Sequence, residues 1–213
     1  MLPYPSIRII HRYLWNYGWL LALVLISGCR EAETPRVFPE GEMREGDLAF
    51  RCGMGVFSRA VTTVEDEGVY SHVGILLKDG EDWFVVHAVP GETEFRGDFD
   101  RVKKEPLAVF YGPRRAKRGC LIHTGLDDSL KVENLRRTAL QMARDSVAFD
   151  GNYDLTDSAR VYCTELVWRL YRREGIDLSE GRRQRVNALQ IHGDCLLPEH
   201  LLKYRNNVIY HHF

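Results

Sequence analysis

The sequence lacks the features that mark fibrous, disordered and nucleic-acid-binding proteins. It contains no internal repeat and no low-complexity tract. Lys and Arg number 29 against 30 Asp and Glu, so the net charge of -1 leaves no basic field for nucleic acid. The five cysteines are too few for a disulfide scaffold. With 45% hydrophobic residues in 213, the composition indicates one large globular domain with an appendage.

The sequence also lacks an apolar run of the length that a transmembrane helix needs. Residues 14–28 carry no charge but number only 15, whereas a membrane-spanning helix takes about 20. Because this run follows a leader that carries Arg8 and Arg12 and no acid, it predicts the core of a signal peptide.

The run ends in Ile26-Ser27-Gly28-Cys29, which resembles a bacterial lipoprotein box. The resemblance implies cleavage before Cys29, lipid attachment to that cysteine and firm anchoring, since several acyl chains hold a protein where one does not. We therefore expect a signal peptide over 1–28, a lipid-anchored tether over 29–45 and a domain over 46–213, located in the cell envelope. The alternative is an uncleaved anchor helix with Cys29 as a chance neighbour.

Hydrophobic periodicity predicts strands in the first half of the domain and helices in the second, which indicates an α+β fold. Strands are predicted at 47–51, 72–77, 83–88, 107–111 and 119–123. Helices are predicted from a cap at 127–129 to about residue 148 and over 163–174. A short helix within 189–202 and a strand over 207–212 complete the prediction.

The hairpin between the second and third predicted strands brings two histidines together. If Asp79-Gly80 is a two-residue turn, Lys78 pairs with Glu81, and paired residue numbers sum to 159. His72 then lies opposite His87 on one face of the sheet, with Cβ atoms about 5 Å apart. A loop of three or five residues would break this pairing, and two surface histidines without a role are the alternative.

Cys163 lies at or near the start of a predicted helix. Free N–H groups at a helix amino end stabilise a thiolate, and His72 and His87 are available as a base and its orienting partner. A cap at residues 156–158 would instead leave Cys163 a turn inside the helix. The alternative role is that of a small buried apolar residue.

Four segments in this order resemble the permuted papain-like amidases of the NlpC-type cysteine peptidase superfamily, over roughly residues 45–175. The segments are Gly46-Asp47-Leu48-Ala49-Phe50-Arg51, Tyr70-Ser71-His72-Val73-Gly74-Ile75, Val85-Val86-His87-Ala88 and Tyr162-Cys163-Thr164-Glu165-Leu166-Val167. The resemblance implies a circularly permuted papain-like fold, an antiparallel sheet packed on helices. It also implies Cys163 as nucleophile, His72 as base and His87 as the third, orienting residue. That third position is often acidic in the family, so His87 is a departure.

The activity that the resemblance implies is hydrolysis of an amide through an acyl-thioester, without metal or cofactor. The expected substrate is a cell-wall peptide or an N-acyl lipid, and transfer of the acyl group to another acceptor is a variant. We expect a monomer that contacts the membrane through lipidated Cys29 and binds no nucleic acid. The alternative is a non-catalytic module that binds a ligand or a zinc ion, because Cys163, His72 and His87 are also a possible zinc set.

Other polar residues are expected to have structural roles. Asp47 is expected to fix a turn, and Glu165 to be a structural partner. Asp150, Tyr153 and Asp154 are expected to form a turn and a packed ring, with a place in the cleft as the alternative. Two of Cys52, Cys120 and Cys195 are candidates for a disulfide in an exported protein.

Overall fold

A computed structural model describes residues 36–54, 69–188 and 191–213. The predicted signal peptide, Cys29 and the first part of the predicted tether lie outside the described residues. Within the described ranges, no helix has the length and hydrophobicity to cross a membrane.

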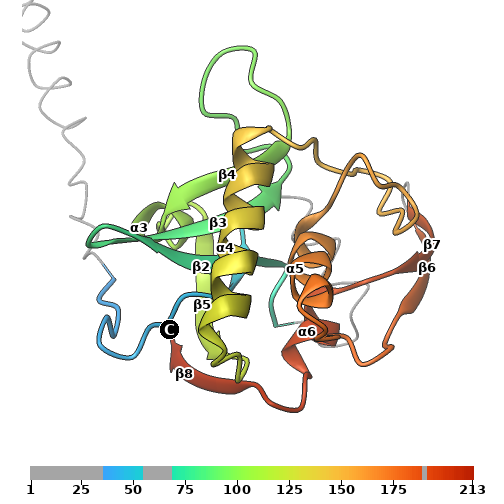
Figure 1. Cartoon of the computed structure of the whole chain (residues 1–213). Coiled ribbons are helices and arrows are strands. Elements are labelled where there is room, and N and C mark those ends of the chain that lie inside the picture. Colours follow the sequence, from blue (N-terminus) through green and yellow to red (C-terminus); the bar gives the residue numbers. More distant parts are fainter. Residues whose placement is uncertain (1–35, 55–68, 189–190) are drawn as a thin grey trace, which may run out of the picture. The chain divides into compact units, whose positions relative to one another are not determined.

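The centre of the domain is a six-stranded sheet in which every neighbouring pair is antiparallel (Figure 1). Its strand order is β4-β3-β2-β1-β5-β8. The strands are β1 (Leu48–Gly53), β2 (His72–Asp79), β3 (Asp82–Val89), β4 (Arg101–Pro106), β5 (Ala116–His123) and β8 (Val208–His212). Helices α4 (Ser129–Arg144) and α5 (Cys163–Arg173) pack on this sheet, so the predicted α+β class is confirmed.

Alternation along the strands gives the sheet two different faces. On β1, Leu48 and Phe50 belong to the core under α4 and α5, whereas Ala49 belongs to a second core on the opposite face. The second core includes the short helix α3 (Leu107–Phe110). Arg51 shares the face of Ala49, and this face also carries the histidines described below.

Residues 36–45 pack against the second face. The Arg36 guanidinium donates to the backbone oxygens of Tyr111 (2.7 Å) and Ala116 (2.8 Å). The Phe38 ring stacks on that of Tyr111, with centroids 5.5 Å apart. The compact unit therefore begins at Arg36, whereas the sequence places a tether up to residue 45. The partners of these side chains lie far along the chain, at the end of α3 and on β5, where a local pattern does not reveal them.

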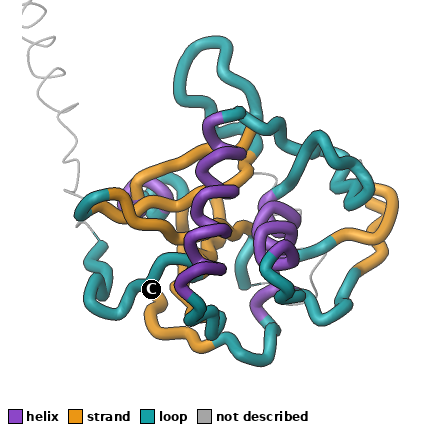
Figure 2. Tube along the Cα trace, in the orientation of Figure 1, coloured by secondary structure: helices purple, strands orange, loops and turns teal. Residues whose placement is uncertain are grey.

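One predicted element is wrong and another is shorter than predicted. The strand predicted at 107–111 is helix α3, and the strand of this region is β4, which immediately precedes it. The helix predicted within 189–202 is reduced to α6 (Pro198–Leu202), where the proline occupies a position at the start of the helix. Before it comes a hairpin of β6 (Gln184–Ala188) and β7 (Ile191–Cys195), visible as a separate pair of strands in Figure 2.

Candidate active site

The hairpin of β2 and β3 places His72 and His87 on one face, as predicted, but in a different register. Asp79 pairs with Asp82, so the turn is Gly80-Glu81, and paired numbers sum to 161. Gly80 has a φ of 62°, which a glycine adopts without strain. Moving the turn by one residue shifts each cross-strand partner by two residues, so every side chain stays on the same face of the sheet. His87 therefore continues the register opposite Gly74 and lies diagonally from His72.

The diagonal arrangement creates a buried chain of hydrogen bonds. His72 Nε2 lies 2.8 Å from His87 Nδ1, and His87 Nε2 lies 3.1 Å from Glu105 Oε2. All three residues are buried. Glu105, on β4, thus places a carboxylate one step beyond His87 in this chain.

Both imidazoles are neutral in the resting protein. Burial, followed by the charge of Arg51, lowers the pKa of His72 and of His87 well below its ordinary value. A carboxylate accepts only, so His87 Nε2 carries the proton that Glu105 accepts, and His87 Nδ1 is an acceptor. His72 Nε2–H must then donate to His87 Nδ1. The network therefore leaves His72 Nδ1 unprotonated, with its lone pair available to accept a proton.

Cys163 is the first residue of α5, and Tyr162 is its N-cap, so the predicted position at the helix start is confirmed. Two bonds fix this helix end against the chain before α6: Tyr162 Oη accepts from Leu196 N at 2.8 Å, and Thr164 Oγ1 donates to Leu196 O at 2.7 Å. Burial raises the pKa of the Cys163 thiol to about 11. Cys163 is therefore a thiol at rest, because the lost hydration outweighs the backbone N–H groups at the helix end that favour a thiolate.

Cys163 and His72 line one cavity of about 730 Å³. Phe149, Tyr153, Leu196 and Leu197 give it an apolar wall. No hydrogen bond joins the described side chains of Cys163 and His72. Catalytic contacts are often long in an unliganded site and shorten when substrate binds.

Arg51 adds a charged network that the sequence reasoning did not assign to the site. Arg51 lies opposite His72 in the β1–β2 register and is 1% exposed. Its guanidinium donates to Phe110 O at 2.8 Å, lies 4.5 Å above the Phe110 ring and pairs with Glu92. The same Phe110 ring contacts both histidines, at centroid distances of 5.8 and 5.1 Å.

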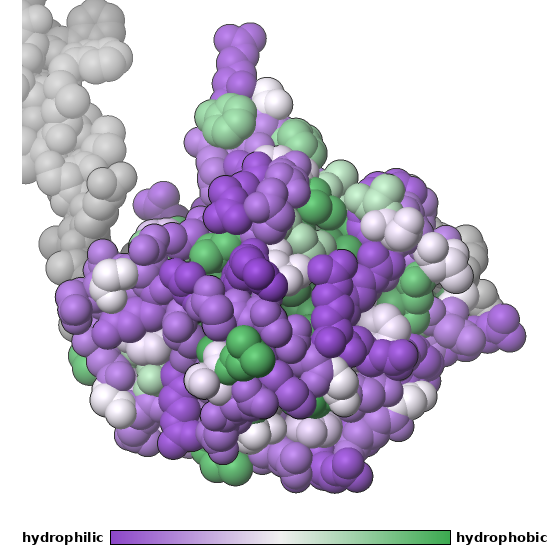
Figure 3. Space-filling view, in the orientation of Figure 1, coloured by the Kyte–Doolittle hydropathy of each residue, from purple (hydrophilic) through white to green (hydrophobic). Residues whose placement is uncertain are grey.

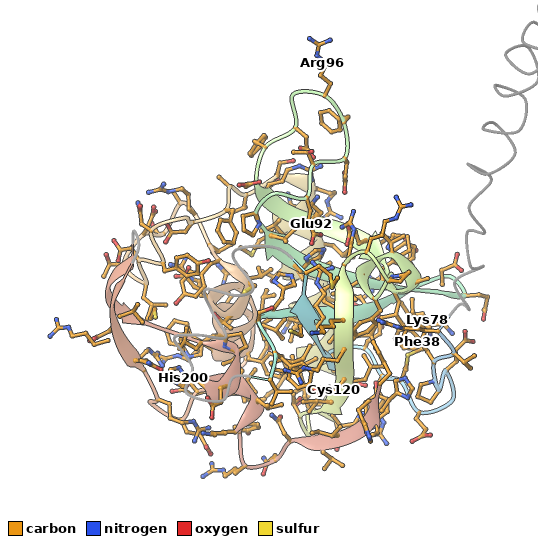
Figure 4. The ribbon with its side chains drawn as sticks, turned by 180° about the vertical axis from the view of Figure 1, so that it is seen from behind. Phe38, Lys78, Glu92, Arg96, Cys120 and His200 are labelled. Atoms are coloured by element: carbon orange, nitrogen blue, oxygen red, sulfur yellow. The ribbon has the colours of Figure 1, made fainter. Side chains whose placement is uncertain are left out.

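Arg115 joins this network to the histidine chain, because it pairs with both Glu92 and Glu105. Figure 4 shows Glu92 at the base of the loop that follows β3, whereas Arg96 lies at its tip. The signal that could have found Arg51 is a cation directly after the apolar Leu48-Ala49-Phe50 of a strand. No comparable signal marks Glu105 within the charged run of β4.

The remaining candidates have structural roles. Asp47 accepts from Arg44 N at 2.9 Å within a turn and also binds His123 Nδ1 at 2.8 Å. Glu165 accepts from Tyr162 N at 3.3 Å, which caps α5. Asp150 accepts from the backbone of its own loop. Tyr153 lines the cavity, and no disulfide joins the described cysteines Cys52, Cys120, Cys163 and Cys195.

The predicted alternative of a zinc set does not fit these residues. Both nitrogens of His87 already take part in hydrogen bonds, and one of them faces His72 directly. The remaining donors are Cys163 Sγ and His72 Nδ1, fewer than a protein zinc site provides. Across the described parts of the chain, no group of three or more His, Cys, Asp or Glu residues could hold a metal ion.

Comparison with known proteins places this geometry in a family. The family described as permuted papain-like amidase enzymes, YaeF/YiiX, C92 family, matches residues 42–188. The fold is similar to the crystal structure of "metalloprotein yiiX" from Escherichia coli O157:H7, with 17% identity, a TM-score of 0.64 and coverage of 79% of this chain and 96% of that chain. No curated protein matches the sequence. The chain belongs to the permuted papain-like amidase family.

Proposed function

We propose that this protein is a cysteine amidase of the bacterial cell envelope that acts through an acyl-thioester on Cys163. One observation carries the proposal. Cys163 opens, at the first turn of α5, onto the same cavity as His72, whose far nitrogen is hydrogen-bonded to the chain His87–Glu105. The substrate is the amide bond of a cell-wall peptide or of an N-acyl lipid.

The protonation states set the order of events. The resting pair is a thiol and a neutral imidazole, so His72 Nδ1 takes the thiol proton as Sγ attacks the carbonyl carbon. The imidazolium then gives this proton to the leaving amine, and the acyl-thioester remains. Water attacks the thioester with His72 again as base, which releases the carboxylic acid and restores the thiol.

Groups around the site stabilise the two charges that develop during acylation, on the oxyanion and on the His72 imidazolium. The backbone N–H of Cys163 is one of the unsatisfied donors of a helix start and is available to the oxyanion. The imidazolium of His72 keeps its Nε2–H bond to His87, and the Glu105 carboxylate stabilises the positive charge through that ring. A buried Arg51 disfavours imidazolium at rest, so the ion pair forms only when the negative charge of the reaction is present.

Trapping of the acyl-enzyme tests the proposal. The purified chain is incubated with a panel of peptide amides and N-acyl lipids, quenched in acid and analysed by intact mass and peptide mapping. We expect an acyl adduct on Cys163 that neutral hydroxylamine removes, as it does with thioesters. His72→Ala should abolish the adduct, while Cys52→Ser, which alters a thiol outside the proposed site, should retain it. An adduct that persists in Cys163→Ala, or substrate turnover without Cys163, would overturn the assignment.

The envelope location rests on the sequence of the amino-terminal segment. We propose that Cys29 carries the lipid and that the protein faces the periplasm or the exterior. Ile26-Ser27-Gly28-Cys29 after an uncharged apolar run supports this location. An amidase whose substrate lies in the cell wall or membrane would be held near that substrate by such an anchor.

A further inference from the structure

The walls of the candidate active-site cavity carry an excess of positive charge. Arg51, Arg114 and Arg115 line the cavity, and among its described lining residues Glu92 is the one acid. Glu92 is shared, because it pairs with both Arg51 and Arg115. The cavity thus has a cationic wall facing the apolar wall described above.

Arg114 is the cation that this network leaves uncompensated. It is exposed at the cavity, and no hydrogen bond or ion pair joins it to another described residue. Its neighbour Arg115, in contrast, pairs with Glu92 and Glu105. Exposed arginines are common, but this one follows Pro113 in a turn and lines the same cavity as Arg51 and Arg115.

Arg51 provides a second, independent observation. It is 1% exposed and lines the cavity, yet its Nε has no hydrogen-bond partner among the described residues. Leaving a buried donor unpaired is unfavourable, because the group loses its hydration without gaining a hydrogen bond. This Nε is itself buried, so Arg51 contributes its charge to the cavity wall, and a guanidinium is the group best suited to the oxygens of a carboxylate or phosphate.

We infer that this wall is an anion subsite that selects amide substrates with a carboxylate or phosphate close to the scissile bond. Arg114 recognises the anion at the mouth, and Arg51 and Arg115 supply the positive field behind it. This inference rests on the proposed function, because it names the class of substrate that Cys163 attacks. Both candidate substrates, a cell-wall peptide and an acyl lipid, can carry such a group.

Alkylation of Cys163 by a charged and a neutral reagent tests the subsite without a known substrate. The rates of modification by iodoacetate and iodoacetamide are measured by peptide mass mapping of the full chain in detergent, with 2-mercaptoethanol as the reference thiol. The ratio of the iodoacetate rate to the iodoacetamide rate should exceed that of the reference thiol by about threefold or more in low salt, since the wall attracts the anion. It should fall toward the reference at about 1 M salt, where the Debye length is about 3 Å.

Variants assign the effect to the wall. Arg114→Gln should reduce the ratio by about threefold, because a unit charge is removed from the path of the anion. Lys117→Gln is the matched control, since Lys117 is an exposed cation of β5 that does not line the cavity, and it should leave the ratio unchanged. Arg114 has no described partner to lose, so the variant should fold normally, which a melting curve verifies.

The outcomes separate this inference from the proposed function. Alkylation of Cys163 with a ratio equal to that of the reference, or one unchanged in Arg114→Gln, would overturn the subsite and leave the amidase assignment standing. A Cys163 that reacts with neither reagent would overturn both. Protection against iodoacetamide by N-acetylglutamate would support a peptide carboxylate as the ligand, and protection by glycerol 3-phosphate would support a phosphate.

Discussion

Gly74 controls the distance between the two histidines, and its replacement by alanine should disrupt the site while the chain still folds. A Cβ at position 74 would lie 2.4 Å from Val85 Cγ1, 2.9 Å from His87 Cβ and 2.9 Å from Val86 O. Carbon atoms in contact are normally about 3.5–4.0 Å apart, so β3 must move by about 1 Å. This shift would lengthen the 2.8 Å bond between His72 and His87 beyond the range of a hydrogen bond.

Two magnitudes follow from this displacement. Overpacking of a well-packed position costs about 1–3 kcal/mol, and each kcal/mol lowers the melting temperature by about 2–4 °C in a domain of this size. Misplacement of a catalytic group by about 1 Å can cost about 10²-fold in rate. We therefore expect Gly74→Ala to melt several degrees lower and to acylate Cys163 about 100-fold more slowly.

Differential scanning calorimetry and the acyl-trapping assay measure the two effects separately. Gly151→Ala is the matched control, because its Cβ would meet no atom within 4 Å and its φ is not in the left-handed region. This control should change neither the melting temperature nor the acylation rate. A Gly74→Ala protein that melts and acylates like the parent would refute the close-approach argument, and with it the importance of the His72–His87 bond.

Four further predictions concern protonation, the relay and the anchor. Because the pKa of Cys163 is raised to about 11, its alkylation by iodoacetamide should keep rising through about pH 9; a plateau near neutral pH would indicate a thiolate–imidazolium pair instead. Because the pKa values of His72 and His87 are lowered, unfolding takes up protons below about pH 6.5, and the free energy of unfolding from urea titrations should fall toward pH 5, with a slope approaching about 2.7 kcal/mol per pH unit. A His72→Gln protein should show a shallower slope. Glu105→Leu should lower the rate of acylation about 10–100-fold. Glu105→Gln should lower it less, since the amide oxygen still accepts the hydrogen bond from His87. Equal losses in the two variants would show that the rate depends on the charge of Glu105 and not on the histidine tautomer that it fixes. Cys29→Ser should accumulate an uncleaved or mislocalised precursor, and a mature protein that mass spectrometry shows to begin elsewhere without lipid would contradict the anchor.

The sequence predicts those parts of the fold that local patterns determine. Apolar strands around His72 and His87 and the amphipathic helix after Cys163 have clear periods, and their elements lie within a few residues of the prediction. The hairpin register shows the limit. A turn offset by one residue moved every pair by two, but the face was retained because side chains alternate with a period of two.

The parts that the sequence could not predict depend on charges that meet only in the folded chain. Strand β4 reads Arg-Val-Lys-Lys-Glu-Pro, which resembles a solvated loop, so the sequence pattern places the strand in the apolar Leu-Ala-Val-Phe that follows. In the structure Lys103 and Glu105 are 2% and 3% exposed. They tolerate burial because Lys103 binds Glu92 O and Glu105 binds Arg115 and His87.

The same buried charges determine what it means for His72 to have a histidine, and not an acidic residue, as its direct partner. A carboxylate directly beside His72 would raise the pKa of that imidazole, whereas His87 transmits only hydrogen-bond direction and leaves the charge on Glu105, one ring further away. Arg115 partly neutralises Glu105, and Arg51 adds a positive charge on the side of His72. Each of these three features favours the neutral form of the His72 imidazole in the resting protein. In the proposed mechanism Cys163 therefore depends on proton transfer during attack, not on a preformed thiolate. The tautomer of His72 is fixed by the Glu105–His87 chain, and it is the feature on which the proposed rate should depend most.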